Sequence, residues 1–211
     1  FFAAHPDYPK IAMVAKEADQ KDNIGGGWHT DHSYDVEPAM GSVLVARVLP
    51  ERGGDTRFAS MYRAYETLDD ETKEEIEDLR ATHSARHIFG SRSYVSKSDA
   101  SGRIGNAGAA DVLEDVSHPV VITHPLSGKR ALYVNPGFTV RVEGRNKDAS
   151  DALLNHLFAH AMKSDHVCQF KWRPGSVAFW DNRSTWHWAL NDYHGQRRVM
   201  HRITIDGCAL N

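Results

Sequence analysis

The feature of this sequence that most constrains its fold is a succession of short segments rich in β-branched and aromatic residues, separated by turn residues. The run GSVLVARVL at 41–49 ends at Pro50 and is typical of a strand. Segments of similar character follow at 120–142, 169–172, 177–179, 185–190 and 199–206. Many short strands with few helices predict a mainly β fold with flanking helices, either a sandwich or a barrel, with jelly rolls included.

Two regions have helical spacing instead. The acidic stretch at 60–80 predicts two short helices with a solvated charged face, and Asp69 or Asp70 is placed to cap the second. Farther along, apolar side chains recur at helical spacing behind a cap at Ser150 or Asp148. They are Leu153, Leu154, Leu157, Phe158, Ala161 and Met162. This region therefore predicts one amphipathic helix.

Other segments lack a period and are predicted to be loops. Residues 1–27 contain the turn-rich HPDYP at 5–9 and the flexible GGG at 25–27, which indicates a loop that feeds a site. A hairpin-like reversal is predicted at RGGD, 52–55. Residues 91–117 are rich in Ser, Gly, Ala and Asp, and long loops of this kind in compact domains are often active-site lids.

Length, charge and cysteine content narrow the class of protein. The 211 residues fit a single domain spanning 1–211. A formal net charge of -3 argues against nucleic-acid binding, and no apolar run approaches the length of a membrane span. Two cysteines are too few for a disulfide framework, so a cytoplasmic location is expected. The oligomeric state stays open, with a homo-oligomer among the options.

Histidine is abundant, with 13 in the chain, and it is the commonest metal ligand. In WHTD at 28–31, His29 and Asp31 lie two residues apart, so in an extended backbone both side chains project to one side. His187, in a distant predicted strand, is a third candidate ligand. Two histidines and one carboxylate on one face of a metal form the triad of non-haem Fe(II) oxygenases. For the tripeptide alone, a surface histidine beside an acid is the alternative.

Arg198 and Arg202 share one face of the predicted strand at 198–204, about 13 Å apart at about 3.3 Å per residue. Two guanidinium groups inside a barrel need anionic partners, and arginine suits bidentate binding of carboxylates or sulfonates. The strand therefore indicates two bound anions, with a pair of surface arginines in salt bridges as the alternative.

Two further histidine patterns are weaker metal candidates. His156 and His160 lie four apart on the predicted helix, but Leu157 stands where the zincin pattern needs Glu, so both are interpreted as solvent-side residues. HTDH, which ends at His32, is similar to a motif of dinuclear zinc hydrolases, but Gly27 stands where that motif needs a further histidine.

Several motifs, in order, resemble the taurine dioxygenase (TauD/TfdA) family of Fe(II)- and 2-oxoglutarate-dependent oxygenases. They are WHTD at 28–31, GGDT at 53–56, THPLSGKRALYVNPGF at 123–138, WDNR at 180–183 with His187, and QRRVMHR at 196–202. The resemblance extends from His5 to about Gly207. It implies a double-stranded β-helix (jelly roll, cupin-like), and, because the family has a longer N-terminal segment, we expect residues before Phe1.

The resemblance implies a role for each of ten residues. His29, Asp31 and His187 match the Fe(II) ligands, while Thr56 and Arg198 match the positions that hold the distal carboxylate of 2-oxoglutarate. Arg202 matches a position that faces the substrate anion. The other substrate-pocket positions are His5, Tyr8, Phe89 and Phe138.

The implied reaction uses Fe(II), 2-oxoglutarate and O₂ to hydroxylate a small organic anion, with release of succinate and CO₂. The anion is a sulfonate, a sulfate ester or a carboxylate, such as taurine or an aryloxyalkanoate. Two departures from the taurine enzyme, GGG at 25–27 and HSY at 32–34, argue against taurine itself, and the glycines favour a bulkier body. A non-catalytic jelly-roll module that binds a small anion is the alternative from another class.

Overall fold

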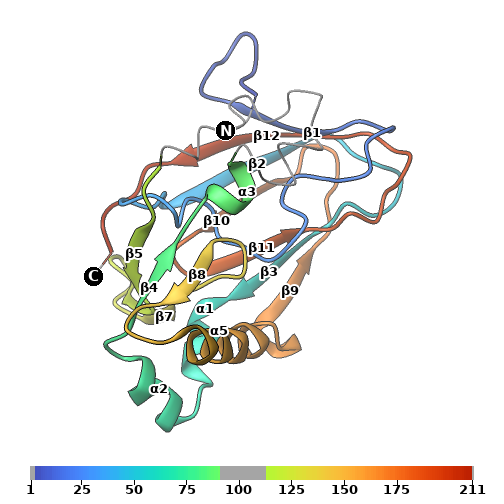
Figure 1. The fold of residues 1–211 in the computed structure, drawn as a ribbon. Helices are drawn as coiled ribbons and strands as arrows, with labels where there is room; N and C mark the ends of the chain where they lie inside the picture. The colour runs from blue at the N-terminus through green and yellow to red at the C-terminus, as the bar shows by residue number, and fades with distance from the viewer. Residues whose placement is uncertain (1–2, 91–112, 211) are drawn as a thin grey trace.

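The computed structural model describes residues 3–90 and 113–210 (Figure 1). The strands are β1 (Ala12–Lys16), β2 (Gly41–Val48), β3 (Thr56–Ser60), β4 (Arg80–His83), β5 (Val116–Pro119), β6 (Val121–Thr123), β7 (Arg130–Leu132), β8 (Thr139–Val142), β9 (Val167–Phe170), β10 (Val177–Asp181), β11 (Thr185–Ala189) and β12 (Arg198–Ile205). The helices are α1 (Met61–Glu66), α2 (Asp70–Ile76), α3 (Arg86–Phe89) and α5 (Lys147–Ala161), with a 3-10 turn, η2 (Ser164–His166). None of these helices is both long and apolar enough to cross a membrane.

The largest sheet has the order β1-β12-β2-β10, and its neighbouring strands are antiparallel. In β2, buried Leu44 and Ala46 alternate with half-buried Val43 and Val45, so one face of the strand points into the protein. The strand predicted at 41–49 is thereby confirmed. Strand β12 lies between β1 and β2, which places the predicted arginine strand in the middle of the sheet.

A second antiparallel sheet has the order β11-β3-β9. Because β2 and β3 belong to different sheets, the chain at 52–55 passes from one sheet to the other, and the predicted hairpin-like reversal is wrong. Smaller sheets are formed by β5-β4-β8 and β6-β7. Among the described residues the fold is therefore mainly β with a few flanking helices, as the sequence predicts.

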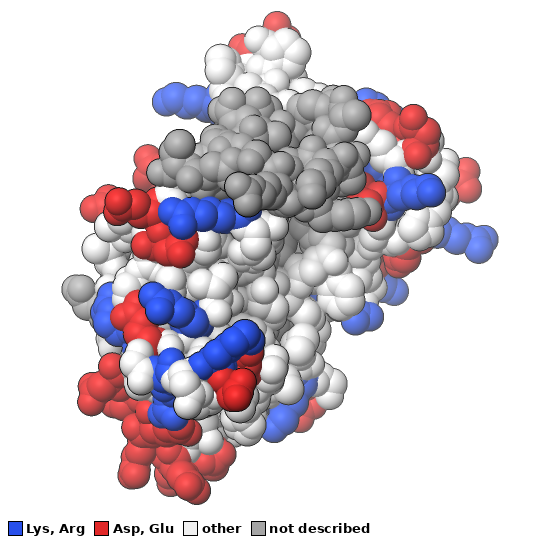
Figure 2. Space-filling view, in the orientation of Figure 1, with Lys and Arg blue, Asp and Glu red and all other residues white. Residues whose placement is uncertain are grey.

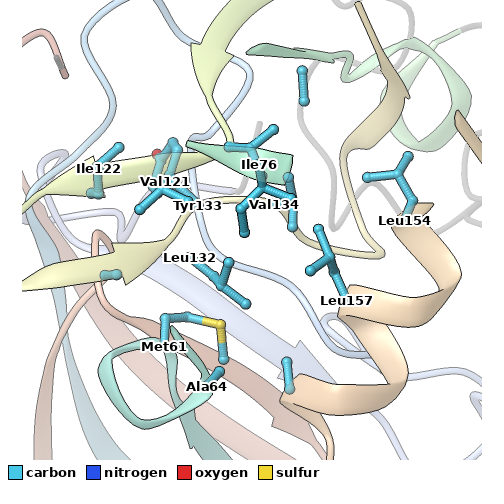
Figure 3. Packing of buried hydrophobic residues seen from close by; sticks show 14 of the residues in the cluster. Met61, Ala64, Ile76, Val121, Ile122, Leu132, Tyr133, Val134, Leu154 and Leu157 are labelled. Carbon is cyan, nitrogen blue, oxygen red and sulfur yellow. The ribbon is translucent and has the colours of Figure 1, made fainter. Parts of the chain in front are cut away.

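The main hydrophobic core lies where α1, α2 and α5 pack on strands β6 and β7 (Figure 3). Leu157 of α5 and Met61 of α1 are almost fully buried there, together with Leu132 of β7. Burying a side chain of this size stabilises the fold by about 1.5–3 kcal/mol. This core lies in the lower part of the molecule in Figure 1, away from β12 and β2.

The two short helices agree with the prediction. Asp69 caps α2 by accepting a hydrogen bond from Thr72 N at 2.8 Å. The exposed carboxylates at 69–78 gather at the lower end of the molecule (Figure 2), as expected of a solvated face.

The amphipathic helix begins earlier than predicted, and one of its histidines is buried. Asn146 is the cap of α5 and accepts a hydrogen bond from Ala149 N at 2.9 Å, whereas Ser150 is buried and accepts one from Val142 N. His160 is not a solvent-side residue, because it is buried and its Nε2 contacts the Ala64 carbonyl at 2.9 Å. His156 is exposed, as predicted.

The predicted loops are confirmed only in part. The N-terminal segment contains β1, which pairs with β12 and was not predicted. Most of the predicted lid at 91–117 lies outside the described residues, and its last two residues begin β5.

Candidate functional site

Three side chains with metal-binding atoms meet where the WHTD segment lies beside β11. His29 and His187 form a β-bridge in which His29 N donates to His187 O at 3.1 Å and His187 N donates to His29 O at 2.8 Å. Their Nε2 atoms lie 3.7 and 3.5 Å from carboxylate oxygens of Asp31. One possible ligand atom from each residue lies within 4.8 Å of the other two. In the described part of the chain, no other group of three such residues is this close.

Burial and neighbouring charges leave two of these groups in their metal-binding forms. Burial lowers the pKa of His187 well below its usual value, so its imidazole is neutral at pH 7. Burial opposes ionisation of Asp31, but the positive charge of Arg202, the largest opposing contribution, helps to hold the pKa of Asp31 below its usual value. Neutral imidazole and ionised carboxylate are the forms that bind metal ions.

Neighbouring groups also fix the orientation of the candidate ligands. His29 Nδ1 donates to the Gly27 carbonyl at 2.7 Å, which directs Nε2 toward Asp31. Ser42 Oγ donates to Asp31 Oδ2 at 3.0 Å. A Cβ atom on Gly137 would lie 2.6 Å from the His29 Cβ, so the backbone at Gly137 packs directly on this ligand. Contacts of this kind set the tautomer and direction of metal-binding side chains.

The three residues line a cavity of about 630 Å³. One wall is apolar and is formed by a cluster that contains Tyr34, Phe89 and Phe138, with Ile88 packed against it. Tyr34 and Phe138 have ring centroids 4.8 Å apart, and the Phe138 ring lies 6.2 Å from that of His29. The structure thus brings the sequence-assigned Phe89 and Phe138 to the candidate metal centre.

Thr56 of β3 and Arg198 of β12 line the cavity and are both buried. Trp172 Nε1 donates to Thr56 Oγ1 at 3.0 Å, and Arg198 Nε donates to the Gly54 carbonyl at 3.1 Å. Burial lowers the pKa of Arg198, and a guanidinium remains protonated in proteins. Arg198 Nη2 is buried without a hydrogen-bond partner in the described part of the chain. A buried guanidinium nitrogen in this state favours an anion beside it.

Arg202 also lines the cavity, so both arginines of β12 face it. Its Nη2 lies 3.0 Å from Asp31 Oδ2 and 3.3 Å from Thr204 Oγ1. The resemblance implied that Arg202 faces the substrate, and the structure adds a contact with the carboxylate of a candidate metal ligand.

His5 and Tyr8 are not brought to this cavity. The His5 ring packs 5.0 Å from His201, which alternates with Arg202 along β12 and therefore projects from the other face of that strand. The Tyr8 side chain is 62% exposed. Their assignment to the substrate pocket finds no support in this arrangement.

The three glycines at 25–27 line the cavity, but only one leaves room in it. Gly25 has a φ of 77°, and a Cβ there would lie 3.2 Å from His29 Cε1. At Gly26 a Cβ would lie 2.6 Å from Asn23 Oδ1, whereas at Gly27 it would meet no atom within 4 Å. Gly25 and Gly26 therefore serve close packing, and only Gly27 widens the site.

His32, Tyr34 and His87 also line the cavity, and their sequence patterns predicted no part in the site. His32 and Tyr34 follow Asp31 closely in the chain, so the polar HSY at 32–34 was a signal that could have placed them at the site. His87 gave no signal, because only the folding of α3 brings it to the Gly137 carbonyl, which lies 2.8 Å from its Nε2.

Comparisons with known proteins agree with this geometry. The family model described as "Taurine catabolism dioxygenase TauD, TfdA family" matches residues 1–204. The alkylsulfatase of Acinetobacter baylyi is 36% identical over 207 residues, which cover 96% of this chain and 64% of the relative. The alpha-ketoglutarate-dependent sulfate ester dioxygenase of Pseudomonas putida is 33% identical over 208 residues, which cover 97% of this chain and 68% of the relative.

A solved structure has the same fold. The crystal structure of a taurine dioxygenase from Burkholderia xenovorans superposes with a TM-score of 0.79 at 30% identity. The match covers 98% of this chain and 67% of that one. This chain thus spans about two thirds of the length of these three relatives.

Proposed function

Because this chain belongs to the taurine catabolism dioxygenase TauD/TfdA family, we propose that it is an Fe(II)- and 2-oxoglutarate-dependent dioxygenase. The reaction hydroxylates a small organic anion and releases succinate and CO₂. The observation that carries this proposal is the convergence of three ligand atoms within 4.8 Å of one another at the wall of a cavity. Residues 1–211 would form one double-stranded β-helix domain.

The donor set fits Fe(II). His29, Asp31 and His187 offer two imidazole nitrogens and one carboxylate, which is the facial set that leaves positions open for other ligands. Bound Fe(II), with 2-oxoglutarate and O₂, would supply the oxidation of a substrate C–H bond. The protein's part is to hold and orient the reactants and to keep water out.

The residues beside the triad also fit 2-oxoglutarate. Thr56 Oγ1 and the unpartnered Nη2 of buried Arg198 would bind its distal carboxylate. A carboxylate at this position gives the guanidinium nitrogen its missing acceptor, and hydrogen bonds between two charged groups are the stronger ones.

The cavity supports a substrate with an acidic group and an apolar body. Arg202 supplies positive charge near the triad, and the apolar wall of Tyr34, Phe89 and Phe138 fits an alkyl or aryl body. We propose a sulfonate, a sulfate ester or a carboxylate bulkier than taurine. Among the relatives, an alkylsulfatase and a sulfate ester dioxygenase carry names of this chemistry.

Turnover with a panel of anions tests the proposal. The protein with Fe(II) and 2-oxoglutarate is given taurine, hexyl sulfate or phenoxyacetate, and O₂ uptake and succinate are measured. We expect substrate-stimulated succinate formation that is fastest with hexyl sulfate or phenoxyacetate and absent in His187→Ala. A non-catalytic anion-binding module would bind these anions with neither O₂ uptake nor succinate.

A further inference from the structure

We infer that Trp172 is a positioning residue for 2-oxoglutarate, because it holds both side chains that would bind the distal carboxylate. The inference rests on the proposed function, since it concerns the cosubstrate of that reaction. Trp172 follows β9 in the chain, and its side chain is buried. It contacts Thr56 and Arg198 but does not itself line the cavity, so it would act through these two residues.

The indole N–H of Trp172 sets the direction in which the Thr56 hydroxyl can donate. Trp172 Nε1 donates to Thr56 Oγ1 at 3.0 Å, and an indole N–H can only donate. The Thr56 oxygen therefore accepts this bond, and its own hydrogen must point elsewhere. Within residues 3–90 and 113–210 that hydrogen has no protein acceptor. Because Thr56 is buried and lines the cavity, the hydrogen is available to an oxygen of a bound carboxylate.

The face of the same indole supports Arg198. Arg198 Cζ lies over the Trp172 ring, 5.9 Å from its centroid, where a guanidinium and an aromatic face attract each other. Arg198 Nε donates to the Gly54 carbonyl, and a Cβ on Gly54 would lie 3.2 Å from Arg198 Cδ. The ring and the backbone at Gly54 together hold the guanidinium, while its Nη2 is left for an acceptor.

Thr56 and Arg198 come from different sheets, so their spacing depends on what joins those sheets. Thr56 belongs to β3 in the sheet β11-β3-β9, and Arg198 belongs to β12 in the sheet β1-β12-β2-β10. Trp172 contacts both residues and packs in a buried cluster with Met200 of β12. Its ring lies 4.8 Å from that of Phe170 in β9. An indole fixed in this way pre-organises a hydroxyl and a guanidinium for one carboxylate.

A double-mutant cycle tests this role. Trp172→Phe removes the N–H and keeps an aromatic ring beside Arg198, and Thr56→Val removes the hydroxyl. Binding of 2-oxoglutarate to wild type, both single variants and the double variant is measured by calorimetry with Fe(II) and without O₂. Trp186→Phe is the matched control, because this tryptophan is also buried but packs on Phe158 and does not line the cavity. Melting temperatures show that each variant is folded.

We expect Trp172→Phe to weaken 2-oxoglutarate binding about three- to tenfold, as loss of a neutral hydrogen bond implies. Thr56→Val should weaken it about tenfold or more, because it removes a donor to a charged group. Adding Trp172→Phe to Thr56→Val should change binding by less than about twofold, since the hydroxyl through which the indole acts is already absent. Trp186→Phe should bind 2-oxoglutarate as wild type does.

Equal weakening by Trp172→Phe with and without Thr56→Val would overturn the inference, because the indole would then act through packing and not through the hydroxyl. Unchanged binding in Trp172→Phe, or an equal loss in Trp186→Phe, would also overturn it. In steady-state assays Trp172→Phe should raise the KM for 2-oxoglutarate and keep the KM for hexyl sulfate within about twofold. If Trp172→Phe does not fold, the same cycle is measured with Trp172→Met, which also lacks a donor and fills irregular space.

Failure of the proposed function has a different outcome. If wild type binds 2-oxoglutarate but forms no succinate with any of the anions, the proposed function fails, and the binding cycle still decides the role of Trp172. If wild type with Fe(II) binds no 2-oxoglutarate, the inference is wrong.

Discussion

Gly137→Ala tests whether the close approach of the backbone to His29 sets the metal centre. The added Cβ would lie 2.6 Å from the His29 Cβ and 3.2 Å from Asn135 Oδ1. Carbon atoms in contact prefer about 3.5–4.0 Å, so the loop and the ligand must separate by about 1 Å. His29 is held on its other side by the β-bridge to His187, and the movement therefore disturbs a candidate ligand.

Gly137→Ala should lower both the stability of the fold and the affinity for metal. Overpacking of this kind costs about 1–3 kcal/mol of the free energy of unfolding. For a chain of this length each kcal/mol lowers Tm by about 2–4 °C, so we expect a fall of about 2–12 °C. Metal affinity should fall about 10- to 100-fold, as it does when the support of a ligand is disturbed.

Calorimetric melting and Fe(II) titration without O₂ measure both effects. Gly27→Ala is the matched control, because Gly27 also lines the cavity and a Cβ there meets no atom within 4 Å. The reasoning is refuted if Gly137→Ala keeps the Tm and Fe(II) affinity of wild type, or if Gly27→Ala loses as much.

Three further predictions concern other parts of the structure. Arg198→Lys should raise the KM for 2-oxoglutarate about tenfold and leave the substrate KM nearly unchanged in steady-state assays, since lysine lacks the fork that binds carboxylates; equal effects on both would contradict the assignment. Asn146→Ala should lower the free energy of unfolding in urea by about 1 kcal/mol, and Asp148→Ala by less, because Asn146 is the cap of α5. Burial lowers the pKa of His83 to about 3 from 6.5, so folding keeps it neutral and stability should fall as pH drops from about 6.5 toward 3. Between pH 7 and pH 5, the free energy of unfolding measured in urea should fall less in His83→Gln than in wild type.

Local patterns in the sequence predicted the candidate ligands and the arginine strand. The two-residue spacing of His29 and Asp31 and the alternation along β12 depend only on backbone geometry, and the structure places these residues around one cavity. His187 was a third candidate from its place in a distant predicted strand, and the resemblance then assigned it as an iron ligand, because no local pattern joins it to His29.

Features set by tertiary packing were harder to predict. The cap of α5 was misplaced because several polar residues precede the helix and only the folded backbone selects Asn146. The burial of His160 is an exception, because it lies three residues after Leu157 on the apolar face and helical periodicity could have predicted it. His5 and Tyr8 were assigned from the resemblance, yet their place depends on how β1 pairs with β12.

The most direct test of the central claim follows oxygen from ¹⁸O₂ during turnover with Fe(II), 2-oxoglutarate and hexyl sulfate. If His29, Asp31 and His187 hold the iron of a 2-oxoglutarate-dependent dioxygenase, mass spectrometry should find one ¹⁸O atom in each succinate, and His187→Ala should form none. Succinate without ¹⁸O, or no succinate from protein that binds Fe(II) and 2-oxoglutarate, would contradict the account.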